Sequence, residues 1–333
     1  MRGLRKKAVV LAAVAALAMS SLTGCSGDYA VDNNKVAVTV GDSEITLGAL
    51  NFYLRYDQSG IEQVYGSALG DGFWKIEVTE GCTFEENEKE SLINAMTQMC
   101  ILEDHMSELG VSLSADELSK IEKAADAFIA ANAEEARALV SGEKDIIVDV
   151  LKMCTISKLT YEEIIKDVST EVADADAAQK KLAYLGFTKS STLTLEQAKA
   201  EAELFLKEAK ESGDMVKLAT EQQAPVHEYT FDSKTTELSK EIVAAADKLK
   251  EGEFAELLQV DDKYYVVQLI SEFDKDATEA KKASIVAERQ DKKFQEVYKP
   301  WKEATKVVIN DKAIEEISLH GLKVNMLEKK EQK

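Results

Sequence analysis

The spacing of apolar residues divides the chain into two patterns that meet near residue 176. An alternating, β-branched run, Val36–Val40, predicts a strand, and Ser43–Thr46 after it predicts a second strand or the entry to a helix. Apolar residues then recur at helical spacing as far as residue 167. They predict helices at about 47–56, 86–109, 114–131 and 141–167, with an irregular, Gly-rich segment at 60–84.

A stretch of acidic and small residues, 168–176, separates this helical part from a block that contains strands. Runs at 181–187 and 264–270 predict strands, and residues 194–211, 215–222 and 237–249 predict helices between them. Residues 177–274 therefore predict a compact unit of mixed strands and helices. Helical spacing returns over 275–305, a short strand follows at 306–309, and the charged C-terminal residues are expected to fray.

The N-terminus has the layout of an export signal. Its basic residues, Arg2, Arg5, Lys6 and Lys7, precede a short apolar run at 8–19. That run is too short to span the roughly 30 Å core of a bilayer as a permanent helix. Leu22-Thr23-Gly24-Cys25 resembles a bacterial lipobox, which implies cleavage before Cys25 and a lipid on its sulfur. The alternative is an ordinary signal peptide followed by a chance cysteine.

We therefore expect a signal peptide at 1–24, then the lipidated Cys25 with a flexible spacer at 25–34. The protein would be lipid-anchored at the extracytoplasmic face of the cell membrane. The formal net charge is −20, and removal of the signal peptide would make it more negative. Such a surface repels nucleic-acid phosphates and anionic lipid headgroups, so nucleic acid is not expected as a partner. Membrane contact would come from the lipid on Cys25.

No sequence motif indicates a cofactor, a metal or a nucleotide. The chain contains no phosphate-binding loop, no His-Glu-x-x-His and no nucleophile elbow, so neither a cofactor nor a metal site is expected. Cys82, Cys100 and Cys154 cannot all pair, and their spacing fits no zinc site. Buried, reduced thiols are favoured. A Cys82–Cys100 bridge stays open, and the sequence leaves the redox state of all three undecided.

Three segments carry a resemblance to a known family. They are the strand and turn at 36–46, the helix and turn at 242–254 with the strand at 264–269 after it, and residues 301–319. In this order they resemble the extracytoplasmic parvulin-type foldases, which are PpiC-like peptidyl-prolyl isomerases with a trigger-factor/SurA-like N-terminal region. The family includes Gram-positive foldase lipoproteins.

The resemblance implies an α+β fold. A helix-rich, discontinuous chaperone domain would consist of residues 35–175 and 275–333. A parvulin-like domain of antiparallel sheet and helices, residues 177–274, would be inserted between its halves. The strand Val36–Val40 would pair with Val307–Ile309, so both ends of the chain would share one sheet.

The resemblance also implies a catalytic pair that this chain lacks. Parvulins place one histidine on the first strand and one on the last strand of the domain, with an Asp or Cys nearby. Here residues 182–187 contain no histidine, and Tyr265 stands where the second one belongs. No catalytic residue is assigned, and whether the chain is an enzyme stays open. His227 is either a displaced base or an exposed loop residue, the latter being favoured; His105 is expected on the surface, and His320 carries no pattern.

Apolar residues of the family's peptide pocket are better retained. Phe231, Leu238 and Ile242 fall where the resemblance places pocket-lining residues, and Tyr265 would face them. We interpret these four as a candidate peptide-binding groove, with ordinary core packing as the alternative for Leu238 and Ile242.

The predicted function is that of a membrane-anchored foldase or chaperone that binds unfolded or nascent secreted proteins, with weak or absent prolyl isomerase activity. One alternative is an active peptidyl-prolyl cis-trans isomerase. Another is a non-catalytic scaffold lipoprotein of the cell envelope. Formation of a homodimer stays open, and the sequence does not identify the clients.

Overall fold

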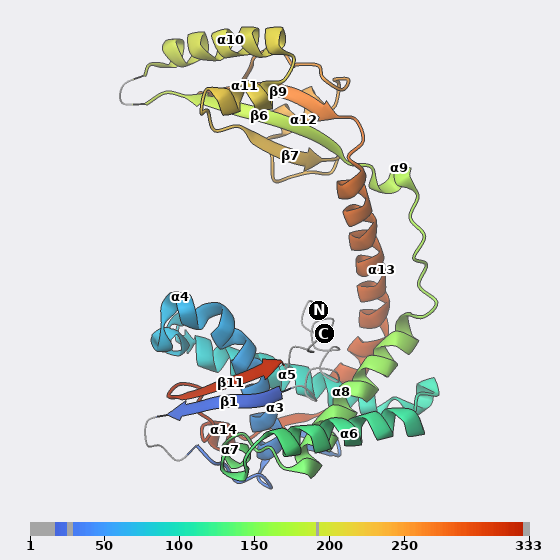
Figure 1. The fold of residues 1–333 in the computed structure, drawn as a ribbon. Helices are drawn as coiled ribbons and strands as arrows, with labels where there is room; N and C mark the ends of the chain where they lie inside the picture. The colour runs from blue at the N-terminus through green and yellow to red at the C-terminus, as the bar shows by residue number, and fades with distance from the viewer. Residues whose placement is uncertain (1–16, 25–28, 191–192, 329–333) are drawn as a thin grey trace. The chain divides into compact units, whose positions relative to one another are not determined.

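The computed structural model describes residues 17–24, 29–190 and 193–328, and it divides into two compact units (Figure 1). Unit 1 consists of Met1–Asp167 and Asp291–Lys333, and unit 2 of Val168–Gln290. The boundary at residues 290 and 291 falls inside one helix, α13 (Lys275–Ala304). The fold is helix-rich with antiparallel sheets, as the α+β prediction states.

The central sheet of unit 1 joins the two ends of the chain. Its strands are β2 (Val36–Val40), β3 (Ser43–Thr46) and β10 (Val307–Ile309), in the order β10-β2-β3. The predicted pairing of β2 with β10 is confirmed, because Val307 lies opposite Val40 and Ile309 opposite Val38 in an antiparallel register. Gly41, with φ of +58°, makes the tight turn between β2 and β3.

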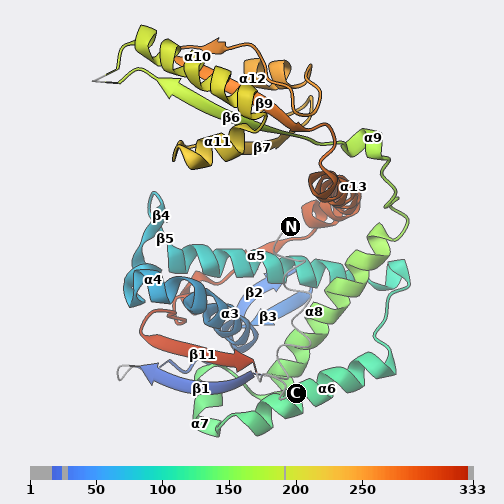
Figure 2. The same ribbon diagram turned by 45° about the horizontal axis from the view of Figure 1, so that its top comes forward.

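Helices α3 (Leu47–Ile61), α5 (Phe84–Asp104), α6 (Ala115–Ala131) and α8 (Lys144–Ile165) build the body of unit 1. Helix α8 packs against the other three, and α3 also contacts α5 (Figure 2). Two of these helices begin with a capping box, in which the side chains of Thr83 and Ser114 bind backbone N–H groups three residues ahead. Their apolar stripes meet in one core, where Phe52 and Phe128 make an edge-to-face contact.

A fully buried arginine on α3 helps to hold the C-terminal segment in this unit. Arg55 donates from Nε to Asn51 and from Nη1 to Gln58. Burial lowers the pKa of Arg55 to about 10, although Glu85 and Glu62 nearby favour its charged form. Gln58 in turn donates to the carbonyl oxygens of Leu319 and Leu322, so a polar network inside the core fixes the segment after α14 (Asp311–Ile314).

Two parts of unit 1 differ from the predictions. Residues 62–83, expected to be irregular, form a π-helical turn η1 (Glu62–Gly66), short helices α4 (Ser67–Leu69) and η2 (Asp71–Lys75), and a hairpin of β4 (Glu77–Thr79) and β5 (Cys82–Thr83). The expectation of C-terminal fraying is wrong for β11 (Leu322–Glu328), because buried Leu322 and Val324 dock it on the core.

The N-terminal expectations lie partly outside the described residues, Cys25 among them. Residues 17–24 of the expected signal peptide form β1 (Leu17–Gly24), which pairs antiparallel with β11. Tyr29 and Val31, which belong to the expected flexible spacer, pack against the core of unit 1. Among the described residues, no helix combines the length and apolar character needed to cross a membrane.

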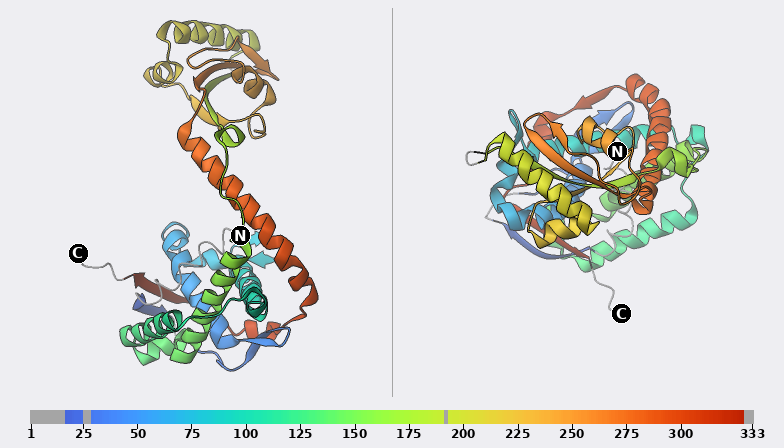
Figure 3. Two further views of the ribbon diagram at one scale, coloured as in Figure 1. Left: turned by 90° about the vertical axis from the view of Figure 1, so that its right-hand side faces the viewer. Right: turned by 90° about the horizontal axis from the view of Figure 1, so that it is seen from above.

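Unit 2 is built on a four-stranded antiparallel sheet with the order β7-β6-β9-β8. Its strands are β6 (Lys180–Thr188), β7 (His227–Phe231), β8 (Leu258–Val260) and β9 (Lys263–Ser271). Helices α10 (Leu195–Ser212) and α11 (Met215–Glu221) pack on one face, and α12 (Lys240–Ala246) packs on the other (Figure 3). Thr194 and Gly213 cap α10 at its two ends, which agrees with the helix predicted at 194–211.

A buried amide fastens the turns around this sheet. Gln268 on β9 is 3% exposed; its side-chain oxygen accepts from the backbone N–H of Met215, and its nitrogen donates to the carbonyls of Gly213 and Gly252. One side chain thus satisfies three backbone groups and links two loops to the central strand. Helix α12 is shorter than the predicted 237–249, and strand β7 was not predicted.

Candidate peptide-binding face

The candidate site lies on the face of the unit 2 sheet that carries α12. Side chains alternate between the two faces of a strand, so Leu182 and Tyr184 of β6 share this face. Ala183 and Leu185, between and after them, pack under α10 and α11 on the opposite face. Phe231 of β7 and Tyr265 of β9 also lie on the α12 face.

The structure brings the four predicted site residues into one apolar cluster. Phe231 and Ile242 are 0% and 1% exposed, so they form the floor of the cluster and have no surface to offer a ligand. Leu238 and Tyr265 are half-buried and pack at its edge. Ile242 is therefore an ordinary core residue, which was the alternative to a place in the groove. Phe231 is a core residue as well.

Tyr184 is a residue of this face that the sequence analysis missed. Its ring centroid lies 6.2 Å from that of Tyr265 and 5.3 Å from that of His227. We call Tyr184, Tyr229, Tyr265 and His227 the tyrosine face. The alternation of Leu182 and Tyr184 with small or aliphatic residues was the available signal, but the strand register was needed to place Tyr184 beside Tyr265.

A glycine makes room for one of these rings. Gly186 of β6 lies directly opposite Tyr265 of β9 in the antiparallel register. A Cβ atom at position 186 would lie 3.0 Å from Cε1 of Tyr265, which is closer than ordinary van der Waals contact. Because glycine has no side chain, the Tyr265 ring can lie over the backbone of β6.

The charged groups around the face are engaged in the scaffold. Lys180, which lies opposite Phe231 in the strand register, pairs with Asp247 after α12 at 3.0 Å. Asp232, just after β7, accepts from Gln179 at 3.0 Å and lies 3.5 Å from the ammonium of Lys281. Burial alone would raise the pKa of Asp232, but these partners outweigh it and lower the pKa. The face itself offers aromatic rings, phenol hydroxyls and one exposed imidazole, that of His227.

The other two histidines lie in unit 1 and take part in contacts. The ring of His105, expected on the surface, stacks on Trp301 with a centroid distance of 4.2 Å and 5° between planes. Trp301 is remote from His105 in the sequence, so no local pattern could predict this contact. His320 binds Glu85 through Nδ1 at 2.7 Å.

The structure shows the surroundings of the three cysteines and of the possible metal ligands. Among the described residues, Cys82, Cys100 and Cys154 form no disulfide bond, and the last two are buried. Burial raises the pKa of Cys100 to about 12, so its thiol stays protonated at neutral pH. Across the described ranges, no group of His, Cys, Asp or Glu side chains is arranged to hold a metal ion.

A four-stranded antiparallel sheet with two helices on one face and a third on the other is the framework on which this site is built. Residues 179–284 match the family model for the PPIC-type PPIASE domain. They therefore form a parvulin domain, and the chain as a whole is similar to parvulin-type foldases.

Two curated relatives are similar to nearly the whole chain, and several solved structures are similar to a large part of it. Foldase protein PrsA of Clostridium perfringens strain 13 is 23% identical over 353 residues, covering 96% of this chain and 98% of the relative. The structure of foldase protein PrsA from Streptococcus pneumoniae is 14% identical and covers 78% of this chain and 82% of its own, with a TM-score of 0.29. That of PrsA from Lactococcus lactis is 17% identical, with coverages of 86% and 98% and a TM-score of 0.31.

Proposed function

We propose that the protein is a membrane-anchored extracytoplasmic foldase that binds unfolded secreted polypeptides and has weak or absent prolyl isomerase activity. The observation that carries this proposal is the pair of tyrosines, Tyr184 and Tyr265, on the first and last long strands of a parvulin domain. The family resemblance implies histidines on those two strands. Similarity to foldase protein PrsA over nearly the whole chain supports the foldase role.

Tyrosine side chains in place of histidines would abolish catalysis of prolyl isomerisation but would still bind apolar segments of a polypeptide. Rotation about an X–Pro amide faces a barrier of roughly 18–20 kcal/mol, and the family lowers it with a polar network around two imidazoles. A phenol can donate and accept a hydrogen bond, but it does not change charge near neutral pH as imidazole does. The half-buried rings of Tyr184 and Tyr265 still present apolar area next to Leu238.

That apolar area suits an unfolded polypeptide. Burial of apolar surface contributes about 25 cal/mol per Å² and does not depend on the identity of the partner side chain. Aromatic rings add large, stiff contact surfaces with hydroxyl groups at their edges. A client could therefore bind through any exposed apolar segment and dissociate when that segment becomes buried in its own fold.

The anchoring part of the proposal depends on Cys25. Its lipobox-like context supports cleavage and lipid attachment, which would place both units outside the cell membrane. Metabolic labelling with a radioactive fatty acid would test it: the label should enter the protein and should be absent from a Cys25→Ala variant. Incorporation into the variant would contradict the assignment.

Two assays on the purified full chain test the activity. In a proline-containing tetrapeptide assay, we expect no rate enhancement over the uncatalysed isomerisation. In a light-scattering assay with reduced insulin, we expect suppression of aggregation that falls in the double variant Tyr184→Ala/Tyr265→Ala. Phe273→Ala is the matched control, since it removes an exposed aromatic ring of unit 2 outside the tyrosine face. Isomerisation that is lost in Tyr265→Ala would instead identify an active isomerase.

A further inference from the structure

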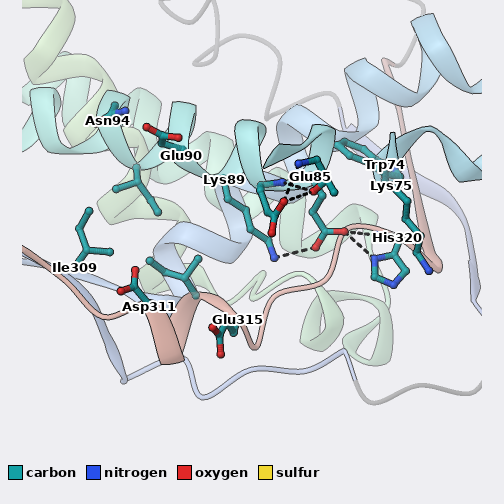
Figure 4. Close-up of a pocket in the computed structure, with 14 residues that line it drawn as sticks. Trp74, Lys75, Glu85, Lys89, Glu90, Asn94, Ile309, Asp311, Glu315 and His320 are labelled. Atoms are coloured by element: carbon teal, nitrogen blue, oxygen red, sulfur yellow. Dashed lines mark hydrogen bonds and ion pairs between the residues drawn. The ribbon is translucent and has the colours of Figure 1, made fainter. Parts of the chain in front are cut away.

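Unit 1 contains a cleft that the parvulin domain does not explain. It has a volume of about 720 Å³ and lies between α5 on one side and the segment of β10 and α14 on the other (Figure 4). Ile93 of α5 and Ile314 of α14 give it an apolar lining, and Ile309 of β10 lies at one end. Trp74 and His320 lie toward the other end (Figure 4).

The strand beside this cleft has a free edge. The carbonyl of Lys306 accepts from Gly41, and the N–H of Asn310 donates to Ala37, so alternate residues of β10 bond to β2. The N–H and C=O groups of Val307 and Ile309 therefore point away from β2. No strand in the described part of the chain pairs with that side of β10.

The side chains of β10 are also unusually exposed for their type. Val307, Val308 and Ile309 are 39%, 49% and 46% exposed. Proteins usually protect an edge strand with charges, proline or a covering element, because an open apolar edge invites another strand. The described residues place none of these on β10 itself.

The acidic groups of the cleft indicate what kind of strand would fit. Glu85 is already engaged, because it binds Lys89 and His320 at 2.8 and 2.7 Å. Glu90, Asp311 and Glu315 line the cleft, are exposed, and form no ion pair with any residue that the structure describes. Figure 4 shows Asp311 beside Ile309, at the end of the cleft formed by the open strand edge, and Glu90 on α5 across the cleft.

We propose that this cleft and the edge of β10 bind an extended segment of an unfolded polypeptide that alternates apolar and cationic side chains. The segment adds a strand to β10 through the outward backbone groups of Val307 and Ile309. Its apolar side chains cover Ile309, which is 46% exposed and lies above the buried Ile93 and Ile314, and its lysines or arginines meet the three unpaired carboxylates. This inference rests on the proposed function, and it adds a second binding surface with a preference for charge.

Charge complementarity selects this occupant over an anionic one. A formal net charge of −20 repels acidic segments at long range and attracts basic ones. Side chains on one face of an added strand recur about every 6.8 Å, so successive lysines can reach different carboxylates along the cleft. Main-chain hydrogen bonds give such strand addition its affinity, and the flanking pockets give it selectivity.

Fluorescence anisotropy on the full chain with two labelled eight-residue peptides, (Val-Lys)₄ and (Val-Glu)₄, tests the proposal. We expect binding of the lysine peptide, weakened by salt, and at least about tenfold weaker binding of the glutamate peptide. The triple variant Glu90→Gln/Asp311→Asn/Glu315→Gln should lose about tenfold in affinity for the lysine peptide. Its matched control, Glu134→Gln/Glu135→Gln/Asp145→Asn, removes three other exposed carboxylates of unit 1 and should keep the affinity.

A proline tests the strand addition separately from the charges. Ile309→Pro removes an N–H that points away from β2, so the pairing of β10 with β2 should persist. We expect Ile309→Pro to bind the lysine peptide several times more weakly than Ile309→Ala, which removes the same side chain and keeps the N–H. Thermal unfolding checks that both variants remain folded.

The outcomes separate this inference from the proposed function. Equal binding of the two peptides, or equal losses in the triple variant and its control, would overturn the acidic cleft as a selective site. Suppression of insulin aggregation by the same preparations would then leave the foldase proposal standing. Selective binding of the lysine peptide without any suppression of aggregation would support the cleft and contradict the foldase proposal.

Discussion

The tyrosine face of unit 2 and the acidic cleft of unit 1 differ in the chemistry that they offer to a polypeptide. Tyr184 and Tyr265 present rings on a face whose nearby charges, such as Lys180 and Asp247, already pair with one another. The cleft places unpaired carboxylates next to an open strand edge. A neutral aromatic surface selects for exposed apolar residues, whereas the cleft selects for charge and extended backbone. Under the two proposals, different segments of one client would occupy these two surfaces.

The largest expected effect separates the floor of the tyrosine face from its surface. Phe231→Ala should lower the free energy of unfolding of unit 2 by about 3–5 kcal/mol, because it empties a fully buried site. Leu238→Ala, at a half-buried position of the same cluster, should cost about 1 kcal/mol. Hydrogen exchange of the β6 and β9 amides measures both. Similar, small losses in the two variants would mean that Phe231 is not core and belongs to the binding surface.

A smaller effect tests how Tyr265 is held. Gly186→Ala should destabilise unit 2 by about 1–2 kcal/mol, because the new methyl group meets the Tyr265 ring. Gly60→Ala in α3 is the control, since no atom lies within 4 Å of the added methyl group, and it should be neutral or stabilising. Chemical shifts of the Tyr265 ring should move only in the first variant. An unperturbed ring and unchanged stability would show that Gly186 does not position Tyr265.

The pH dependence of the stability of unit 1 tests the end of the cleft where Glu85 binds Lys89 and His320. Burial alone would raise the pKa of Glu85, but hydrogen bonds from Lys89 and His320 outweigh it, so the pKa is lowered. The stability that Glu85 contributes is therefore complete above its unfolded pKa of about 4.3 and is lost as the pH falls through the lower folded value. Glu85→Gln should destabilise unit 1 at pH 7 and flatten its loss of stability below about pH 5.

Asp232 provides the matching control in unit 2. Its pKa is also lowered, through Gln179, the N–H of Lys234 and Lys281. Asp232→Asn should flatten the acid dependence of unit 2 and leave that of unit 1 unchanged, as followed by hydrogen exchange in each unit. An unchanged acid dependence of unit 1 in Glu85→Gln would show that this carboxylate does not fix the C-terminal segment.

The smallest expected effect concerns salt at the tyrosine face. The affinity of a neutral apolar peptide for this face should change less than about twofold when the salt concentration rises. No charge–charge interaction between the peptide and the protein contributes to this binding. The lysine peptide at the cleft should lose affinity under the same change. A strong salt dependence at both surfaces would remove the distinction between them, and the double variant Tyr184→Ala/Tyr265→Ala would identify which surface holds the neutral peptide.

Elements with a strong local signal could be predicted from the sequence. Thr194 and Gly213 delimit α10, and alternation in Val36–Val40 predicts β2. Strand β7 was missed because it is a mostly exposed edge strand with little alternation in its burial. Strand β11 was missed because Leu322 and Val324 lie among charged residues and give no clear local pattern. Their burial depends on contacts with residues that are distant in the sequence.

The candidate site shows the same limit. The family resemblance located Phe231, Ile242 and Tyr265, but the sequence could not tell which of them face solvent. Tyr184 emerged only from the register that sets β6 beside β9. The cleft of unit 1 was out of reach for the sequence alone, because its two sides come from α5 and from residues after 305.

The sharing of one sheet between β2 and β10 has a consequence for biosynthesis. The chain emerges from an export channel with its N-terminal end first, so β2 and β3 appear early, whereas β10 and α14 follow only after all of unit 2. Domains tend to fold as they emerge. Unit 2, an uninterrupted stretch of chain, can therefore complete its fold while unit 1 still lacks a strand and the core residues Phe294 and Tyr298. A foldase with this arrangement passes through a stage in which the N-terminal part of unit 1 is itself incompletely folded and exposes apolar residues.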